Sequence, residues 1–166
     1  MENINVKITV QDLGEIELEL YPDKAPKTVE NFVMLVKSNF YENLIFHRVI
    51  PGFMIQGGGF DAMMNDTNAA SIRGEFAANG FPQNDIKHKR GVISMARTMA
   101  PNSASSQFFI MHNDSPHLDG QYAAFGAVTK GIEVVDKIAA VPTTTKHLYY
   151  QDCPVDPVII EKIEII

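Results

Sequence analysis

An apolar segment that carries a single arginine is the part of the sequence best suited to chemistry. Within residues 46–58, Arg48 and Gln56 stand among large apolar side chains. Alternate side chains of a pleated strand point to one face, so we expect Arg48 to share a face with Phe46 and Ile50. The guanidinium then either extends to solvent at the rim of a barrel or acts as a fixed donor at an apolar pocket, where Gln56 can bond and orient it. Buried polar groups occur in both settings, so these residues alone leave both interpretations open.

Other reactive residue types are present without the spacing that their chemistry needs. The only local cluster of metal-ligating types consists of His112, Asp114, His117 and Asp119. Its ligand geometry is undefined, and the glycine run 57–59 matches neither phosphate-binding loop pattern. Ser103, Ser105 and Ser106 lack the G-x-S-x-G pattern of a nucleophile, and Cys153 has no neighbouring histidine. We therefore expect no metal, no cofactor and no covalent catalysis.

Length and composition are those of one globular domain, which we place at residues 1–166. The sequence is 45% hydrophobic and 20% charged, and its 14 basic against 20 acidic residues give a net charge of −6. Because the few basic residues are dispersed, we expect no nucleic-acid partner. The lone Cys153 favours a reducing compartment, and apolar runs such as 32–36 are far shorter than the roughly 20 residues that span a bilayer. With no targeting pattern at the N-terminus, we expect a cytoplasmic protein that contacts no membrane. We also expect a monomer.

The elements that must position Arg48 follow from hydrophobic periodicity. Apolar residues alternate over 4–10 and 16–20, which predicts a hairpin with one solvent-facing side. Spacings of three and four residues predict helices over 26–36 and 131–140. Further short strands are predicted within 43–60 and over 91–96, 107–111 and 158–166. Many short strands with two helices favour an antiparallel β architecture, although periodicity does not distinguish a barrel from a sandwich.

Several ordered motifs run in one register along nearly the whole chain. They cover residues 25–32, 46–60, 91–96, 101–103, 106–110, 118–120 and 125–126. In these motifs the chain resembles the cyclophilins, the cyclosporin-binding family of peptidyl-prolyl cis-trans isomerases, and is most similar to their single-domain bacterial cytoplasmic members. The resemblance implies a mainly β fold, a closed eight-stranded antiparallel barrel capped at each end by an α-helix.

The resemblance also implies a role for particular residues. It places Arg48, Gln56 and Phe53 at the catalytic centre, with the arginine as the catalytic group. The residues that it implies for substrate binding are Met54, Ala96, Arg97, Gln107, Phe109, His117, Leu118 and Tyr122. Among these, the proline pocket is formed by Phe53, Met54, Phe109 and Leu118, the polar floor by Gln56 and Gln107, and the backbone that pairs with substrate by Ala96 and Arg97.

Three departures from the commonest family pattern lie in this set. His117 stands where tryptophan is usual, Tyr122 where histidine is usual, and Arg97 where asparagine is frequent, with one extra residue within 97–100. The implied partners are proline-containing peptides and unfolded or folding proteins, and we expect cyclosporin to bind weakly. The alternative is that the protein acts without catalysis, either as a prolyl-peptide binding module or as a chaperone-like protein. Neither function would need a hydrogen-bond donor at position 48. An unrelated hydrolase on a barrel is a third alternative.

Overall fold

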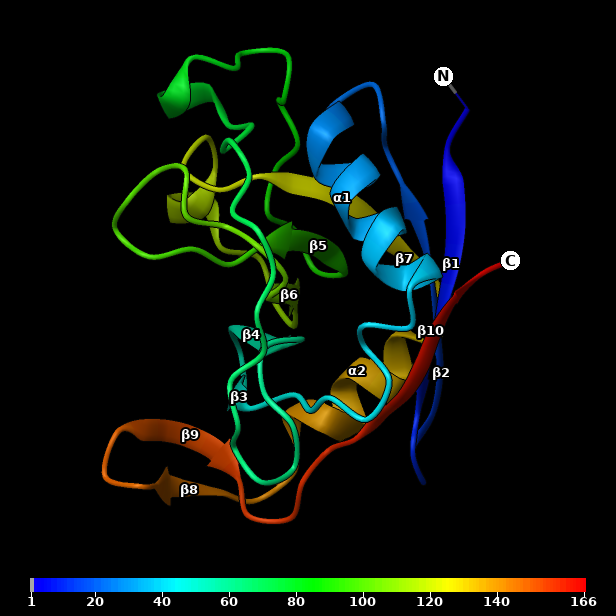
Figure 1. Cartoon of the computed structure of the whole chain (residues 1–166), viewed down its shortest axis with the longest axis vertical. Coiled ribbons are helices and arrows are strands. Elements are labelled where there is room, and N and C mark those ends of the chain that lie inside the picture. The colour runs from blue at the N-terminus through cyan, green and yellow to red at the C-terminus, as the bar shows by residue number, and fades with distance from the viewer. Residues whose placement is uncertain (1) are drawn as a thin grey trace.

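The computed structural model describes residues 2–166, which form one strongly curled antiparallel sheet with two α-helices (Figure 1). The sheet has eight strands in the order β10-β1-β2-β7-β5-β6-β4-β3. Their bounds are β1 Ile4–Val10, β2 Gly14–Leu20, β3 Arg48–Ile50, β4 Met54–Gly57, β5 Val92–Met95, β6 Phe108–Met111, β7 Ala124–Lys130 and β10 Ile160–Ile165. The predicted mainly β, eight-stranded antiparallel architecture is therefore confirmed.

The barrel is completed by a short bridge and lacks a continuous ladder between its edge strands. Strands β3 and β10 lie at the two ends of the strand order. Between them, Ile45 forms an isolated antiparallel bridge with Ile159, and the Phe46 N–H donates to the Val158 carbonyl at 3.0 Å. The expected closure thus holds only through residues 43–46 and 158–160, because the edge strand β3 has three residues and begins beyond this bridge.

The first hairpin follows the predicted alternation. In β1 and β2 every second residue is buried, and the buried set is Val6, Ile8, Val10, Ile16, Leu18 and Leu20. The opposite side carries charges, as in the 3.0 Å ion pair of Lys7 with Glu15. Apolar burial on one face and solvation on the other fix this register, because a slip by one residue would expose the whole apolar set.

Helix α1 (Pro26–Lys37) packs its apolar face on the sheet. Phe32 lies 5.2 to 5.7 Å, between ring centroids, from Tyr41, Phe108 and Phe125. Burial of each such ring contributes roughly 2 to 3 kcal/mol to stability. Pro26 at the first position needs no hydrogen-bond donor there, which suits the start of a helix.

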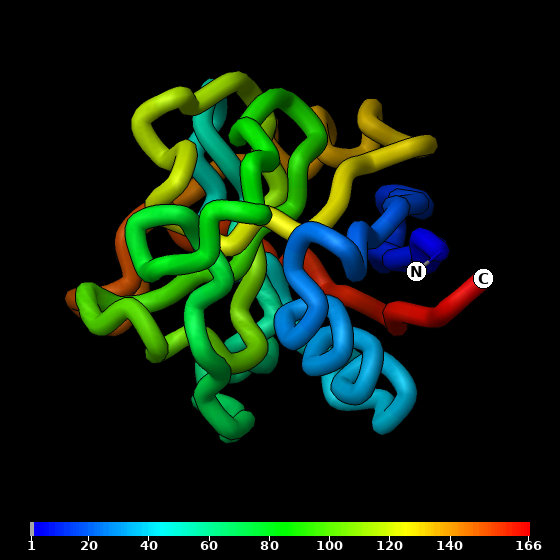
Figure 2. The backbone as a smooth tube through the Cα atoms, turned by 90° about the horizontal axis from the view of Figure 1, so that it is seen from above, coloured from blue at the N-terminus to red at the C-terminus, as the bar shows by residue number. Residues whose placement is uncertain are grey.

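Helix α2 (Ile132–Ala139) covers the other end of the curled sheet and buries Val134, Val135 and Ile138 (Figure 1). Both helices agree with the predicted segments to within two residues. Within residues 2–166, neither is long and apolar enough to cross a membrane. Figure 2 shows that the chain ends on the same side of the molecule as its first strand.

A second, two-stranded sheet was not predicted. It consists of β8 (Thr143–Lys146) and β9 (Tyr150–Pro154), which project from the body of the fold (Figure 1). Its first strand is almost wholly exposed, so it lacks the apolar alternation that marks a half-buried strand. Two short 3₁₀ helices, η1 (Ala77–Asn79) and η2 (Pro116–Leu118), were also absent from the prediction.

Candidate active site

Alternate residues of β4 and β6 divide between the core and a second hydrophobic cluster on the outer face of the sheet. In β6, Phe108 and Ile110 belong to the main core, whereas Phe109 and Met111 belong to the second cluster. In β4, Ile55 faces the core and Met54 the second cluster. This division follows from the two-residue period of a strand. It explains why 108–111 is an unbroken apolar run, and it gives the outer cluster a rigid floor.

A small pocket of about 120 Å³ opens on this outer cluster, and we call it the central pocket. Its lining consists of Arg48, Phe53, Met54, Gln56, Ala96, Arg97, Phe109, Leu118 and Tyr122. All nine belong to the eleven site residues expected from the sequence. The structure thus brings together side chains from β3, β4, β6, η2, the β3–β4 turn and two loops, which are up to 74 residues apart in the chain.

A row of polar side chains crosses one side of the central pocket. Arg48 and Gln56 are cross-strand partners, and the Arg48 Nη1 donates to the Gln56 Oε1 at 3.3 Å. The Gln56 Nε2 in turn donates to the Gln107 Oε1 at 2.9 Å. The predicted bond between Arg48 and Gln56 is confirmed. The chain of amides leaves the guanidinium exposed at the pocket mouth with its direction set by Gln56.

The expectation that Arg48 shares a face with Phe46 is wrong. Phe46 is fully buried in the main core, whereas Arg48 is exposed. The regular strand β3 begins only at Arg48, so the alternation does not extend back to Phe46. Arg48 therefore lies at the rim and beside the apolar pocket at once, which joins the two interpretations that the sequence left open.

The remaining walls of the central pocket are apolar and closely packed. Met54, Phe109 and Leu118 are each less than a tenth exposed. The Phe109 ring meets Tyr122 edge to face, with centroids 5.7 Å apart and an interplanar angle of 86°. Such packing holds the rings in one arrangement, so the pocket presents a fixed apolar surface to a ligand.

His88 supports the central pocket from behind and was missed in the sequence analysis. Its buried ring stacks on Phe109 at 6.0 Å, its Nε2 lies 2.9 Å from the Ser94 Oγ, and its Nδ1 lies 3.2 Å from the Asp119 Oδ1. Burial lowers the pKa of His88, while Asp119 acts in the opposite direction. Nothing in the local sequence marks this histidine, because Asp119 is 31 residues away and both lie in irregular segments.

The other two predicted residues, Gln107 and His117, line cavities that adjoin the central pocket. Gln107 lines a polar cavity of about 320 Å³ that also includes Gln56. His117 is exposed and lines a cavity of about 660 Å³ together with Met99, with its ring 6.0 Å from that of Phe53. The Ala96 N–H already donates to the Gln107 carbonyl at 3.0 Å. A bound peptide would therefore have to pair with the Ala96 carbonyl or with the backbone of Arg97.

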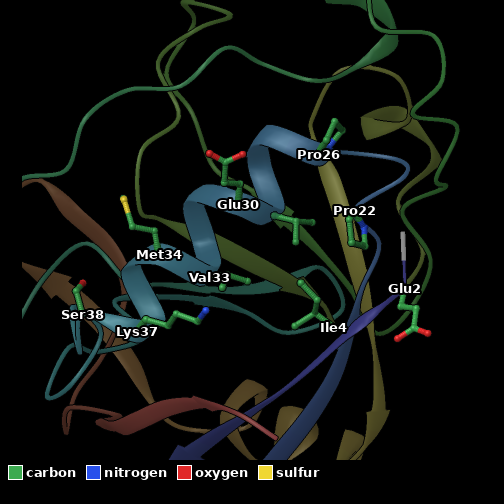
Figure 3. Close-up of a pocket in the computed structure, with 10 residues that line it drawn as sticks. Glu2, Ile4, Pro22, Pro26, Glu30, Val33, Met34, Lys37 and Ser38 are labelled. Carbon is green, nitrogen blue, oxygen red and sulfur yellow. The ribbon is translucent and has the colours of Figure 1, made fainter.

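A more open cavity lies away from this site, between α1 and the start of β1 (Figure 3). Its volume is about 700 Å³ and its inner lining is mostly apolar, with Ile4, Val33 and Met34. Figure 3 shows the charged groups of Glu2 and Glu30 turned away from one another at its margin. With no converging polar groups, this cavity offers no arrangement for a reaction.

The histidines and aspartates considered for a metal have separate partners. The His112 Nδ1 accepts from the Gly52 N–H, and the Asp114 Oδ1 accepts from the Arg90 N–H. Among residues 2–166, no three His, Cys, Asp or Glu side chains gather in a way that could hold a metal ion.

The family described as cyclophilin type peptidyl-prolyl cis-trans isomerase/CLD matches residues 5–165 of this chain. The chain belongs to the cyclophilin family. Among its relatives, the peptidyl-prolyl cis-trans isomerase of Acinetobacter baylyi is 50% identical over 160 residues, which cover 93% of this chain and 81% of that protein. Peptidyl-prolyl cis-trans isomerase B of Escherichia coli is 44% identical over 161 residues, 92% of this chain and 94% of that one. This cyclophilin is thus a peptidyl-prolyl cis-trans isomerase, and the alternative of a binding module without catalysis is not favoured.

Crystal structures agree with the family assignment. A cyclophilin type isomerase of Cryptosporidium parvum superposes with a TM-score of 0.84 at 31% identity, over 99% of this chain and 98% of that one. A second structure of that protein, determined in the presence of the dipeptide Ala-Pro, gives a TM-score of 0.82 at 31% identity and covers 98% of both chains.

Proposed function

We propose that Arg48 catalyses the rotation of X-Pro peptide bonds by donating a hydrogen bond to the proline nitrogen as the bond twists. Amide conjugation sets a barrier of about 18 to 20 kcal/mol, so uncatalysed exchange takes roughly 10 to 100 s. In the twisted state the nitrogen is pyramidal and regains its lone pair. A guanidinium directed at this nitrogen stabilises the twisted state more than either planar state, which is the condition for catalysis.

The observation that carries this proposal is the hydrogen-bonded row Arg48–Gln56–Gln107 beside an apolar pocket. Gln56 accepts from Arg48 and is itself held by Gln107, so the guanidinium is oriented before a substrate arrives. The central pocket then holds the proline ring against Phe109 and Leu118 by apolar burial, worth roughly 25 cal/mol per Å². The carbonyl that precedes the proline is left free to swing. No proton transfer and no covalent intermediate are needed.

We further propose proline-containing peptides and unfolded or folding proteins as substrates. The central pocket suits a proline ring in size and apolar character, and one structure of the related Cryptosporidium protein was determined in the presence of the dipeptide Ala-Pro. Cyclosporin binds weakly in this proposal, because the exposed His117 offers less apolar area than a tryptophan. The protein acts as a single cytoplasmic domain and as a monomer, without contacts to nucleic acid or membranes.

The test compares Arg48→Ala and Arg48→Lys with wild type in a proline isomerisation assay and in a peptide titration. We expect kcat to fall at least about tenfold in both variants, because a loss of about 1.4 kcal/mol in transition-state stabilisation already has this effect. Lysine restores the charge without the planar fork that Gln56 orients, so it rescues only in part.

Arg73→Lys is the matched control, because Arg73 is exposed and lines none of the three cavities at the site. Wild-type turnover in Arg48→Ala would refute the proposed role. If that variant also suppressed the aggregation of an unfolded protein as well as wild type did, the chaperone-like function would be favoured instead.

A further inference from the structure

Two irregular loops contribute Ala96, Arg97 and Tyr122 to the lining of the central pocket. One follows β5 and covers residues 96–107, and the other covers residues 119–123 before β7. Within these ranges neither loop forms a strand ladder. They make only single backbone hydrogen bonds, such as that from the Ala96 N–H to the Gln107 carbonyl. Loops of this kind are mobile unless side chains tie them down. The shape of this side of the pocket therefore depends on the contacts that connect the two loops.

Arg97 makes those contacts through its side chain. Its Nε and Nη2 both donate to the Gln121 carbonyl, at 3.2 and 2.7 Å, and its Nη1 donates to the Thr98 carbonyl at 2.9 Å. One guanidinium thus joins the carbonyl of one loop to that of the other. The bonds from Nε and Nη2 use the fork geometry that is particular to arginine.

The faces of the same guanidinium contact two aromatic rings. Its central carbon lies 4.7 Å from the ring centroid of Phe76 and 4.7 Å from that of Tyr122. A planar, weakly hydrated cation is attracted to the face of an aromatic ring, and the attraction grows where water is excluded. Tyr122 is a wall of the central pocket and packs edge to face on Phe109. The position of this wall is therefore set from one side by Phe109 and from the other by Arg97.

Arg97 lies where the central pocket meets its two neighbouring cavities. It lines all three of them. Arg97 and Tyr122 are also two of the positions at which the sequence departs from the commonest family pattern. The structure shows that these two departures are in direct contact.

We propose that Arg97 is a positioning residue, whose side chain holds Tyr122 and the loop 97–103 so that the central pocket keeps the shape that binds proline. This rests on the proposed function, in which the central pocket receives the proline ring. The Arg97 guanidinium contacts Tyr122, so in this proposal it acts on the substrate through the pocket wall. Its loss reduces the fraction of molecules with a competent pocket, which weakens apparent affinity in the same proportion. Binding to planar and twisted states weakens equally, so KM rises while kcat is preserved.

The test measures peptide affinity by titration and the isomerisation constants for Arg97→Lys, Tyr122→Leu and the double variant. We expect Arg97→Lys to raise the Kd and the KM of a short Ala-Pro peptide about five- to tenfold and to change kcat less than about twofold. Lysine keeps the charge but loses the fork and the flat faces. If the two residues act through their contact, the double variant binds the peptide no more weakly than the single variant with the lower affinity, because the contact can be lost only once.

Several results would overturn the proposal. One is a peptide affinity of Arg97→Lys equal to that of wild type and of the Arg73→Lys control. Another is a fall in the kcat of Arg97→Lys with its KM unchanged. The third is a loss of affinity in the double variant that equals the product of the two single-variant losses. Should Arg97→Lys fail to fold, as judged by thermal melting, Tyr122→Phe and Tyr122→Leu test the same contact. The ring that faces Arg97 survives in phenylalanine, so we expect the smaller loss of affinity there, and equal losses contradict the proposal.

These readouts are independent of the role of Arg48. If Arg48→Ala kept its turnover, the proposed catalytic mechanism would fail, while the affinity difference in the Arg97 variants would still report on the shape of the pocket. If instead the Arg97 variants bound the peptide as tightly as wild type while Arg48→Ala lost its turnover, the positioning role would fail. The mechanism at Arg48 would then stand.

Discussion

We predict that His47 makes the stability of this cyclophilin sensitive to mild acid. The side chain is 7% exposed, packs against Phe60 at 4.6 Å between ring centroids, and precedes Arg48 in the chain. Within residues 2–166 its Nδ1 has no hydrogen-bond partner. Burial, with a smaller contribution from the charge of Arg48, lowers the pKa of His47 to about 4. A protonated ring would be a buried cation beside another cation, which the fold does not compensate.

The sign and size of the effect follow from this pKa. Above pH 6.5, His47 is neutral in the folded and the unfolded chain, so stability is complete. As the pH falls below 6.5, the unfolded chain takes up a proton while the folded chain does not until about pH 4, so stability is lost across this window. Each tenfold difference in proton affinity corresponds to about 1.4 kcal/mol. The loss from His47 therefore amounts to about 2 kcal/mol at pH 5 and about 3 kcal/mol below pH 4.

The assay is urea unfolding of wild type and His47→Phe from pH 8 to pH 4. Phenylalanine keeps a ring against Phe60 and cannot titrate, so the variant should lose about 2 kcal/mol less than wild type between pH 8 and pH 5. Some acid sensitivity remains, because burial also lowers the pKa of His88. His147→Phe removes an exposed imidazole and is the matched control. Parallel pH profiles for wild type and His47→Phe would refute the reasoning.

Three further expectations concern the fold, the reaction and the inhibitor. Glu75→Ala should lower the free energy of unfolding by about 3 kcal/mol in urea titrations, because its buried carboxylate accepts from the Thr28 N–H and hydroxyl, both at 2.7 Å, at the first turn of α1; a loss no greater than that of the exposed Glu133→Ala would contradict this. The isomerisation rate should be the same with and without a chelator, and a loss restored by an added metal ion would disprove the metal-free mechanism. His117→Trp should bind cyclosporin more tightly than wild type in an inhibition titration, because indole adds apolar area and an N–H donor beside Phe53. Equal inhibition of the two proteins would show that position 117 does not control this ligand.

Periodicity predicted the parts of the fold in which one face is buried and the other solvated. The β1–β2 hairpin and both helices have that character, and each lies where the apolar spacing placed it. The β8–β9 hairpin escaped prediction because Thr143–Lys146 is exposed on both faces and carries no apolar signal. Closure of the barrel was expected from the resemblance, but its location at Ile45 and Ile159 was not predicted, because a single bridge between segments 114 residues apart leaves no local pattern.

The site was predicted by resemblance, and its supporting contacts were not. Nine of the eleven expected residues line the central pocket. Seven of them lie in motifs that run in one register with the family, whereas Arg97 and Tyr122 lie between such motifs and depart from the commonest pattern. The contacts that hold those residues are long-range and lie in loops. His88 reaches Asp119 across 31 residues, and Arg97 reaches Gln121 across 24. Loop geometry determines such pairs, and neither strand nor helix periodicity contains that information.

Core residues and site residues alternate along β6, so the side chains of the site can be substituted while the core stays intact. Phe108 and Ile110 stabilise the interior with the helices, while Phe109 and Met111 form the floor of the outer cluster. Arg48 is exposed and Tyr122 packs on the outer cluster, so substitutions there remove little of the apolar burial that holds the sheet together. Changes at Phe108 or Phe32 would instead leave a cavity in the interior, at a cost of about 3 to 5 kcal/mol for truncation to alanine. Variants of the pocket therefore report on binding and catalysis in a folded protein, and residues at its rim such as His117 and Arg97 can differ between relatives while the sheet beneath them is preserved.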